Sequence, residues 1–197
     1  MKTEIDLVDV GGGNIGSVSR CLHRLGVEFR QVGADNPPDG SRPVIVPGVG
    51  NFGAVMQSLS ASKLDQTLCK IVRSGTPFLG ICVGMQVLFD SSEESAGVAG
   101  LGLIPGEVVR FNHRKVPQVG WNKVVSKDKE WDEGFVYFVN SYYPVPKNDD
   151  VVLYQSDYGG RFCAAVSTAN ITAFQFHPEK SGEFGEGLLK RWVARVS

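Results

Sequence analysis

Cys82 lies at the centre of the segment Gly80-Ile81-Cys82-Val83-Gly84, directly after an apolar run. The G-x-C-x-G pattern is the cysteine form of the nucleophile elbow, a tight strand-to-helix turn that lifts a nucleophile above the sheet edge. Gly80 and Gly84 have no Cβ, so neighbouring backbone can pass close by. A helix after the turn would favour the thiolate through its N-terminal dipole, and the Val83 N–H would face a developing oxyanion. The segment predicts a nucleophilic cysteine; a buried cysteine beside packing glycines is the alternative.

A thiol nucleophile needs a base, and the chain has three histidines. His23 and His113 lie in polar surroundings that predict surface positions. His177 ends the apolar segment FQFHPEK, and a residue before proline favours an extended backbone. In an extended segment, residues two apart project to the same side, so Glu179 is placed to orient the imidazole. A strand-end histidine beside an incidental glutamate is the alternative, but together with the elbow the pattern predicts a triad of Cys82, His177 and Glu179.

The first half of the chain alternates between apolar runs and helical periodicity. Strands are expected at residues 3–10, 28–33, 43–50 and 76–81, and helices at 14–27, 52–59, 64–73 and from about 82. Continuous apolar strands alternating with helices predict a parallel sheet covered on both faces.

The second half changes to strand and hairpin patterns. Strands and hairpins are expected at residues 106–112, 119–125, 135–143, 151–167 and 171–177, with turns at YGGRF and TAN, before a C-terminal helix from about Ser181. No repeat or long linker divides the chain. We therefore predict a single α/β domain over residues 1–197, with a mostly parallel central sheet flanked by helices and an added antiparallel portion.

Composition excludes several classes of protein. The chain has 197 residues, 42% of them hydrophobic, and a formal net charge of -1, so no basic excess points to nucleic acid. No run approaches the roughly 18 apolar residues of a membrane span, and the start lacks a signal-peptide pattern, so we expect a cytoplasmic protein. The four cysteines are scattered without a C-x-x-C pair, and we expect no disulfide, metal or organic cofactor.

A second motif points to a different class. Gly11-x-Gly13-x-x-Gly16 lies between a predicted strand and a predicted helix, with Asp35 nineteen positions beyond Gly16. This spacing is the fingerprint of a dinucleotide-binding module. Against that interpretation, the chain has no second domain for a substrate, and glycine-rich turns are frequent in α/β folds. The motif stays open as an alternative.

Several segments together resemble a known family. GICVGMQ and QFHPEKS are similar to the class I, triad-type glutamine amidotransferases. The segments PGVGNFGAVM, LGLIPGEVVRF, VPQVGWN and YFVNSYY narrow the resemblance to the glutaminase subunits of imidazole glycerol phosphate synthases. The resemblance runs from the first predicted strand to the last helix and implies a flavodoxin-like core.

The resemblance implies a role for each matching residue. Cys82 would attack the side-chain amide of glutamine, His177 would relay protons and Glu179 would orient it. Gly50 N–H, in the segment 47–50, would join Val83 N–H in holding the oxyanion. The positions implied to contact glutamine are Gly48, Gln86, Glu94, Ser141 and Tyr142. The positions implied to contact a partner subunit are Asn14, Trp121, Asn122 and Lys180.

A partner is also expected on chemical grounds. Ammonia protonates in water and loses its nucleophilicity, so a synthetic glutaminase needs a sealed route to an acceptor. The resemblance implies a heterodimer with a (β/α)₈-barrel cyclase subunit of histidine biosynthesis, without which this chain would be a poor glutaminase. Two departures, Gln118 and Asn140, replace histidines frequent in that family. They leave open a paralogue that feeds another acceptor, such as a sugar amidotransferase. A non-catalytic scaffold and a thiol redox enzyme are weaker alternatives, given the complete triad.

Overall fold

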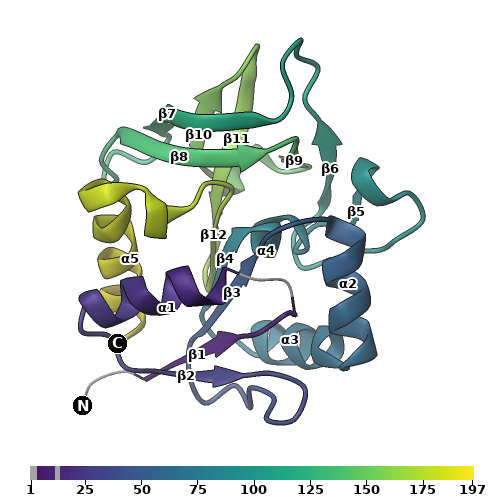
Figure 1. Ribbon diagram of the computed structural model, residues 1–197, viewed down its shortest axis with the longest axis vertical. Coiled ribbons are helices and arrows are strands. Elements are labelled where there is room, and N and C mark those ends of the chain that lie inside the picture. Colours follow the sequence, from purple (N-terminus) through teal and green to yellow (C-terminus); the bar gives the residue numbers. More distant parts are fainter. Residues whose placement is uncertain (1–3, 12–13) are drawn as a thin grey trace.

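A nine-stranded sheet forms the centre of the molecule in the computed structural model, which describes residues 4–11 and 14–197 (Figure 1). The strand order is β2-β1-β3-β4-β12-β11-β10-β7-β8. The first five strands in this order are parallel: β2 (Phe29–Val32), β1 (Ile5–Val8), β3 (Val44–Gly48), β4 (Phe78–Cys82) and β12 (Ile171–Phe174). The strands β1, β3, β4 and β12 are buried along their whole length, as continuous apolar runs in a covered parallel sheet should be.

Antiparallel strands extend the same sheet beyond β12. They are β11 (Arg161–Ser167), β10 (Val152–Asp157), β7 (Gln118–Ser126) and β8 (Gly134–Asn140). A separate three-stranded sheet contains β5 (Ser91–Ser92), β6 (Gly106–Arg110) and β9 (Tyr142–Pro146). The antiparallel portion is therefore mostly a continuation of the central sheet.

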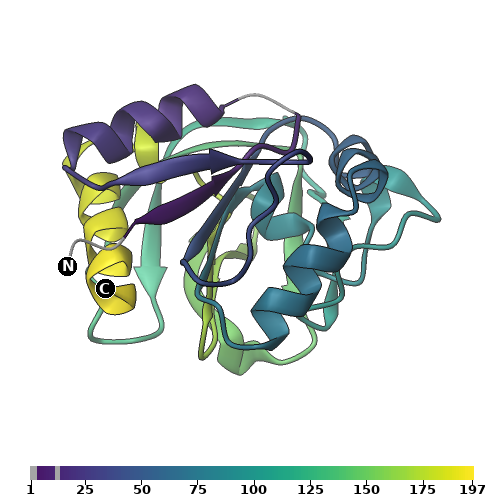
Figure 2. The same cartoon turned by 90° about the horizontal axis from the view of Figure 1, so that it is seen from below.

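Helices cover both faces of the parallel half, as Figures 1 and 2 show. α1 (Ile15–Arg24) and α5 (Gly182–Val196) lie on one side, and α2 (Phe52–Ala61) and α3 (Leu64–Arg73) lie on the other. Three short 3₁₀ turns are η1 (Glu93–Ser95), η2 (Asp149–Val151) and η3 (Pro178–Lys180). Among the described residues, no helix is both long and apolar enough to cross a membrane.

The predicted fold class is confirmed, but three elements differ from the expectation. The helix after Cys82 is only α4 (Val83–Gln86), a single turn, so the dipole that we expected to favour the thiolate is small. After Val87 the hydrogen-bond spacing tightens to three residues, because the Leu88 and Phe89 N–H groups donate to the carbonyls of Met85 and Gln86. The carbonyls of Val87 and Leu88 then accept from Leu101 and Leu103.

The other two differences concern strands. The strand expected over residues 135–143 breaks at Ser141, where β8 ends in the large sheet and β9 begins in the small one. The strand expected over 171–177 ends at Phe174, and residues 175–177 continue past it toward η3. Both breaks place polar side chains at strand ends.

Glycines allow α4 to lie directly against β3 and β4. A Cβ built on Gly84 would lie 1.9 Å from the carbonyl oxygen of Val46, and one on Gly80 would lie 2.5 Å from the carbonyl oxygen of Gly84. A Cβ on Gly48 would lie 2.8 Å from the Gly84 nitrogen. Each obstacle is backbone, which cannot rotate away as a flexible side chain can. Cys82 is held at the top of the sheet by this close approach.

Replacing Gly84 with alanine tests this packing. Because the added methyl group meets the Val46 carbonyl, we expect Gly84→Ala to lower the free energy of unfolding by about 3 kcal/mol. The matched control is Gly187→Ala in α5, where an added Cβ meets nothing within 4 Å and should raise stability by about 0.5–1 kcal/mol. Urea unfolding followed by circular dichroism measures both. Equal midpoints for wild type and Gly84→Ala would show that the close approach is unimportant.

Candidate active site

Cys82 is the last residue of β4 and has an unusual backbone conformation. Its φ is 57° and its ψ is -112°, a positive φ that residues with a side chain seldom adopt. Such a conformation costs about 1–3 kcal/mol and persists only where the surroundings enforce it. The sharp turn between β4 and α4 is the elbow that the sequence predicted.

A cavity of about 300 Å³ opens above this turn. It gathers residues from distant parts of the chain, including the ends of β3, β4 and β8. Nine of the residues singled out from the sequence line it: Gly50, Cys82, Val83, Gln86, Glu94, Ser141, Tyr142, His177 and Lys180. Gly48 instead lies behind the elbow against α4, so its contribution is to packing.

His177 joins the thiol to a carboxylate. Its Nδ1 lies 2.9 Å from Glu179 Oε1, which leaves Nε2 for the Cys82 thiol, with which the ring hydrogen-bonds. His177 is 2% exposed, and Glu179 is also buried. Asn14 Nδ2, at the start of α1, donates to Glu179 Oε1 over 2.6 Å and holds the carboxylate from behind. Thiol, imidazole and carboxylate therefore form one hydrogen-bonded line.

Burial and hydrogen bonding shift the pKa values of His177 and Glu179 in opposite directions. Burial by itself would lower the pKa of His177, but the hydrogen bonds to Cys82 and Glu179 outweigh it and raise that pKa to about 9. Burial would raise the pKa of Glu179, yet its bonds to His177 and Asn14 hold that pKa below its ordinary value. The arrangement favours a charged imidazolium and carboxylate, so His177 is suited to holding a proton beside the sulfur.

The opposite wall of the cavity is held by amide side chains. Gln86 Nε2 and Asn140 Nδ2 both donate to the carbonyl oxygen of Tyr142, over 3.2 and 3.0 Å. Glu94 Oε2 accepts from the Phe52 N–H over 2.7 Å at the start of α2. Donors and a carboxylate thus line a space the size of a small polar molecule.

One polar neighbour of the sulfur was missed at the sequence level. Gln175 has no exposed surface, and its Nε2 lies 3.8 Å from Cys82 Sγ. The two-residue alternation used to place Glu179 beside His177 also puts position 175 on that side when it is followed upstream. Asn140 was noted only as a departure from the family pattern, but it lines the cavity.

The four residues expected at a partner interface have different surroundings. Trp121 and Lys180 are exposed. Asn122 is half-buried, and its Nδ2 donates to the Asp157 carbonyl over 2.7 Å. Asn14 is half-buried against Glu179. Only the first two present side chains freely to a partner.

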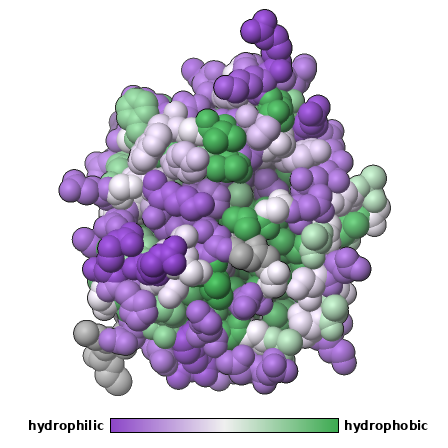
Figure 3. Space-filling model, in the orientation of Figure 1, coloured by the Kyte–Doolittle hydropathy of each residue, from purple (hydrophilic) through white to green (hydrophobic). Residues whose placement is uncertain are grey.

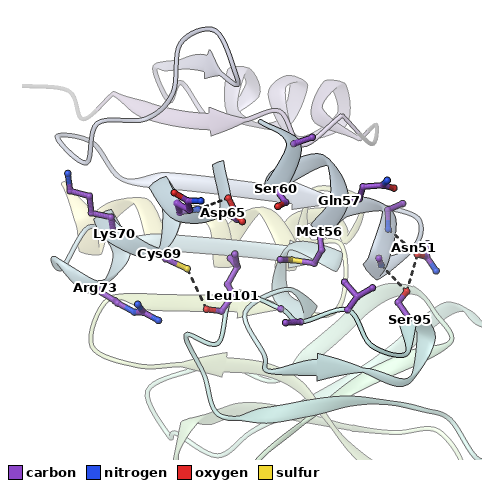
Figure 4. A pocket seen from close by; sticks show the side chains of 17 residues that line it. Asn51, Met56, Gln57, Ser60, Asp65, Cys69, Lys70, Arg73, Ser95 and Leu101 are labelled. Carbon is purple, nitrogen blue, oxygen red and sulfur yellow. Dashed lines mark hydrogen bonds between the residues drawn. The ribbon is translucent and has the colours of Figure 1, made fainter. Parts of the chain in front are cut away.

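A larger groove of about 1250 Å³ lies elsewhere, along α2, α3 and the loop ending at Leu101 (Figure 4). Its thiol, Cys69, donates to the Leu101 carbonyl oxygen over 3.4 Å, and burial raises the pKa of that thiol. A protonated, bonded thiol is a poor nucleophile. The chemistry therefore points to the smaller cavity.

The glycine motif forms a hollow of its own. Gly11 and Asp35 both line a space of about 510 Å³, while Gly13 lies outside the described residues. Asp9 Oδ1 accepts from the Gly11 N–H over 2.8 Å, so a carboxylate occupies the turn where a pyrophosphate would lie. Like charges make this a poor dinucleotide site. In the described part of the chain, no cluster of three or more His, Cys, Asp or Glu side chains is arranged to hold a metal ion.

Comparisons with known proteins place the chain in a family. Residues 6–196 match the family model "Glutamine amidotransferase class-I". The chain is 43% identical to the imidazole glycerol phosphate synthase subunit HisH of Geobacillus sp. (strain WCH70), covering 98% of this chain and 97% of the relative. It is 42% identical to the chloroplastic imidazole glycerol phosphate synthase hisHF of Arabidopsis thaliana, over 96% of this chain and 34% of the plant protein.

Solved structures show the same fold at lower identity. PurLQS from Thermotoga maritima superposes with a TM-score of 0.80 at 19% identity, covering all of both chains. The match of the family model along almost the whole chain, and the near-complete alignment with HisH, give one answer. The chain belongs to the class-I glutamine amidotransferases and, within them, to the HisH subunits of imidazole glycerol phosphate synthase.

Proposed function

We propose that this chain hydrolyses glutamine to glutamate and ammonia, and that it passes the ammonia to a barrel-type cyclase subunit. The observation that carries the proposal is the line of Cys82, His177 and Glu179 at the wall of a cavity of about 300 Å³. A thiol, a base and a carboxylate that orients the base are the parts required for acyl transfer through a covalent intermediate.

His177 takes part in each proton transfer of the proposed reaction. The proton that Cys82 gives up is held on Nε2 of His177, and the sulfur attacks the side-chain amide carbon of glutamine as a thiolate. The imidazolium returns that proton to the leaving nitrogen, which departs as ammonia and leaves a γ-glutamyl thioester. A water molecule then gives a proton to His177 and attacks the thioester. Glutamate leaves as the sulfur departs as a thiolate, and the proton taken from water stays on His177.

Backbone donors would stabilise the tetrahedral intermediates. Val83 N–H follows the nucleophile directly, and Gly50 lies across the cavity on the segment after β3. Glu94 supplies a negative charge suited to the α-ammonium group of glutamine. The backbone of Ser141 and Tyr142 would receive its α-carboxylate. The cavity volume suits a ligand of this size.

A partner surface adjoins the cavity. Apolar side chains on the outer face of the β7–β8 hairpin are exposed to solvent: Val119, Trp121, Phe135 and Val139. Figure 3 shows apolar (green) surface among polar side chains in the upper part of the molecule, where this hairpin lies in Figure 1. The strand alternation puts all four on one side, and Val139 also lines the cavity. Exposed apolar patches of this kind mark protein interaction sites. Docking here would bring an ammonia acceptor close to the thioester.

The relatives support a particular acceptor. Subunit HisH of Geobacillus and the plant protein hisHF both carry the name imidazole glycerol phosphate synthase. We therefore propose that the partner is the (β/α)₈-barrel cyclase subunit. It would use the ammonia to make imidazole glycerol phosphate and an aminoimidazole carboxamide ribotide in histidine biosynthesis. A partner of this class would also activate the glutaminase. Co-purification of a different barrel-type protein would indicate that the ammonia goes to another acceptor.

Replacing the nucleophile separates the two half-reactions. Because Cys82→Ser removes the thiol but leaves the docking surface, we expect the complex to lose glutamine-dependent synthesis by at least about 10³-fold. Synthesis from added ammonium salts should persist. The control Cys69→Ser, which removes a thiol from the larger groove, should retain both activities. Full glutamine-dependent activity in Cys82→Ser would refute the proposed mechanism.

The effect of Glu179 on the pKa of His177 predicts how the activity depends on pH. Glu179 helps to raise the pKa of His177 to about 9, so the imidazolium is lost only as pH rises through that value. Glu179→Gln removes the negative charge, which lowers this pKa, and the alkaline limb of the kcat/KM profile should move to lower pH. The complex should be assayed across pH 6–10, a range of about four units around the ordinary pKa of histidine and above it. Glu183→Gln, an exposed change in the first turn of α5, is the control and should leave the limb in place. An unmoved limb in Glu179→Gln would mean that the carboxylate does not tune the imidazole.

Trp121 tests the docking surface. It is 57% exposed and packs edge-on against Tyr137. We expect Trp121→Ala to raise the Kd for the barrel subunit by about tenfold or more, because large aromatic side chains dominate interface energies. Val145→Ala removes an exposed apolar side chain from β9 and should leave the Kd unchanged. Calorimetric titration measures both. Equal affinities for wild type and Trp121→Ala would show that the hairpin is not part of the interface.

A further inference from the structure

Two side chains hydrogen-bond to the sulfur of Cys82. His177 approaches through its imidazole, and Gln175 approaches through Nε2 at 3.8 Å. Both residues lie in the short segment 175–177 that follows β12, and both side chains reach the same sulfur. In the parallel register, Phe174 on β12 is the partner of Ile81 on β4, so Gln175 follows in line with Cys82. The contact is therefore built into the pairing of the two strands.

The orientation of the Gln175 amide follows from its neighbours. The backbone carbonyl of Tyr142 can only accept, so the Gln86 group facing it must be the NH₂ group, at 3.2 Å. The same Nε2 of Gln86 reaches Gln175 over 2.9 Å, which requires an oxygen there. The remaining end of the Gln175 amide is then its NH₂ group, and that end faces Cys82. One backbone carbonyl thus sets the direction of two side-chain amides.

This direction matters because thiol and thiolate differ as hydrogen-bond partners. A thiolate only accepts, and a donor held beside it stabilises the charged form. The surroundings are dry, since Gln175 has no exposed surface and Cys82 is 4% exposed. A hydrogen bond to a charge is stronger where water cannot compete. The single turn of α4 gives the sulfur little help from a helix dipole, so a side-chain donor has a part to play.

We propose that Gln175 is a catalytic residue that donates a hydrogen bond to the Cys82 thiolate, with its direction fixed by the Tyr142 carbonyl through Gln86. The proposal rests on the proposed function. The S–H bond has broken when the sulfur attacks, its proton is held on Nε2 of His177, and the negative sulfur accepts from the Gln175 donor. In the last step the sulfur leaves as a thiolate, and the same donor stabilises it again. Gln175 gains and loses no proton in either step.

The charged and titratable groups around the sulfur are few. His177 bonds to it, with Glu179 behind the imidazole. Glu94, Tyr142 and Lys180 line the same cavity. Because Gln175 itself does not ionise, it shifts the balance between thiol and thiolate without adding a titration step of its own.

Site-specific alkylation of Cys82 tests the proposal without requiring catalysis. The full chain is treated with iodoacetamide across a range of pH, and modification of Cys82 is followed by peptide mass spectrometry. Gln175→Met keeps a similar shape but has no N–H donor. We expect the pH midpoint of alkylation to move upward by about one unit, and the rate at neutral pH to fall about tenfold. Thr172→Val, a buried polar-to-apolar change on β12, is the matched control and should leave the midpoint unchanged.

A second variant keeps the test decisive if Gln175→Met folds poorly. Gln175→Glu retains the shape and places a negative charge beside the sulfur, so its midpoint should move upward further. Thermal unfolding verifies that each variant is folded. In complex with the barrel subunit, both variants should lose kcat with little change in the KM for glutamine, since the substrate-binding groups remain.

The outcomes separate this proposal from the proposed function. A reactive Cys82 in the wild type with an unshifted midpoint in folded Gln175→Met would overturn the role of Gln175 alone. A wild-type Cys82 that resists alkylation at neutral pH would overturn the glutaminase mechanism as well. An upward shift in both Gln175 variants, absent from Thr172→Val, supports the donor.

Discussion

The backbone reversal at Cys82 is the constraint on which the site depends. A positive φ at a residue with a side chain is tolerated only because glycines at 48, 80 and 84 let β3, β4 and α4 meet through their backbones. The strained turn removes the thiol from the sheet plane and leaves the Val83 N–H beside it. Since the obstacles to a larger residue are backbone atoms, neither strand can shift without moving the other. The strained turn costs stability and fixes the position of the sulfur.

Strand register then determines which residues meet that sulfur. β12 comes from the far end of the chain and pairs with β4 in parallel, so both strands end at the same edge. His177 and Gln175 reach the thiol because they follow β12, and Glu179 follows in η3. A slip of one residue would turn these side chains to the opposite face of the sheet. The buried apolar run of β12 is therefore what aligns His177 with the Cys82 thiol.

The sequence was most informative where chemistry is local. Alternating periodicity predicted the parallel core, and the elbow and the His-Pro-Glu segment predicted the thiol, base and carboxylate that the structure brings together. What it could not predict depends on contacts between distant segments. α4 has a single turn, and the carbonyls that follow it, of Val87 and Leu88, accept from the distant Leu101 and Leu103. The strand expected over residues 135–143 breaks at Ser141 because its two parts pair in different sheets. Gln175 was missed because its importance arises from the pairing of β4 with β12.

Hydrogen bonds connect the exposed β7–β8 hairpin with the neighbours of Cys82. The carbonyl of Tyr137 on β8 accepts from the backbone N–H of His177 over 3.0 Å, and the Tyr137 N–H donates to Ser181 Oγ over 2.9 Å. Three residues further along, Asn140 holds the Tyr142 carbonyl that orients Gln86 and Gln175. One strand thus supports the imidazole at one point and the amide relay at another. A protein that docks on the outer face of β8 would therefore contact the strand that positions both neighbours of the sulfur.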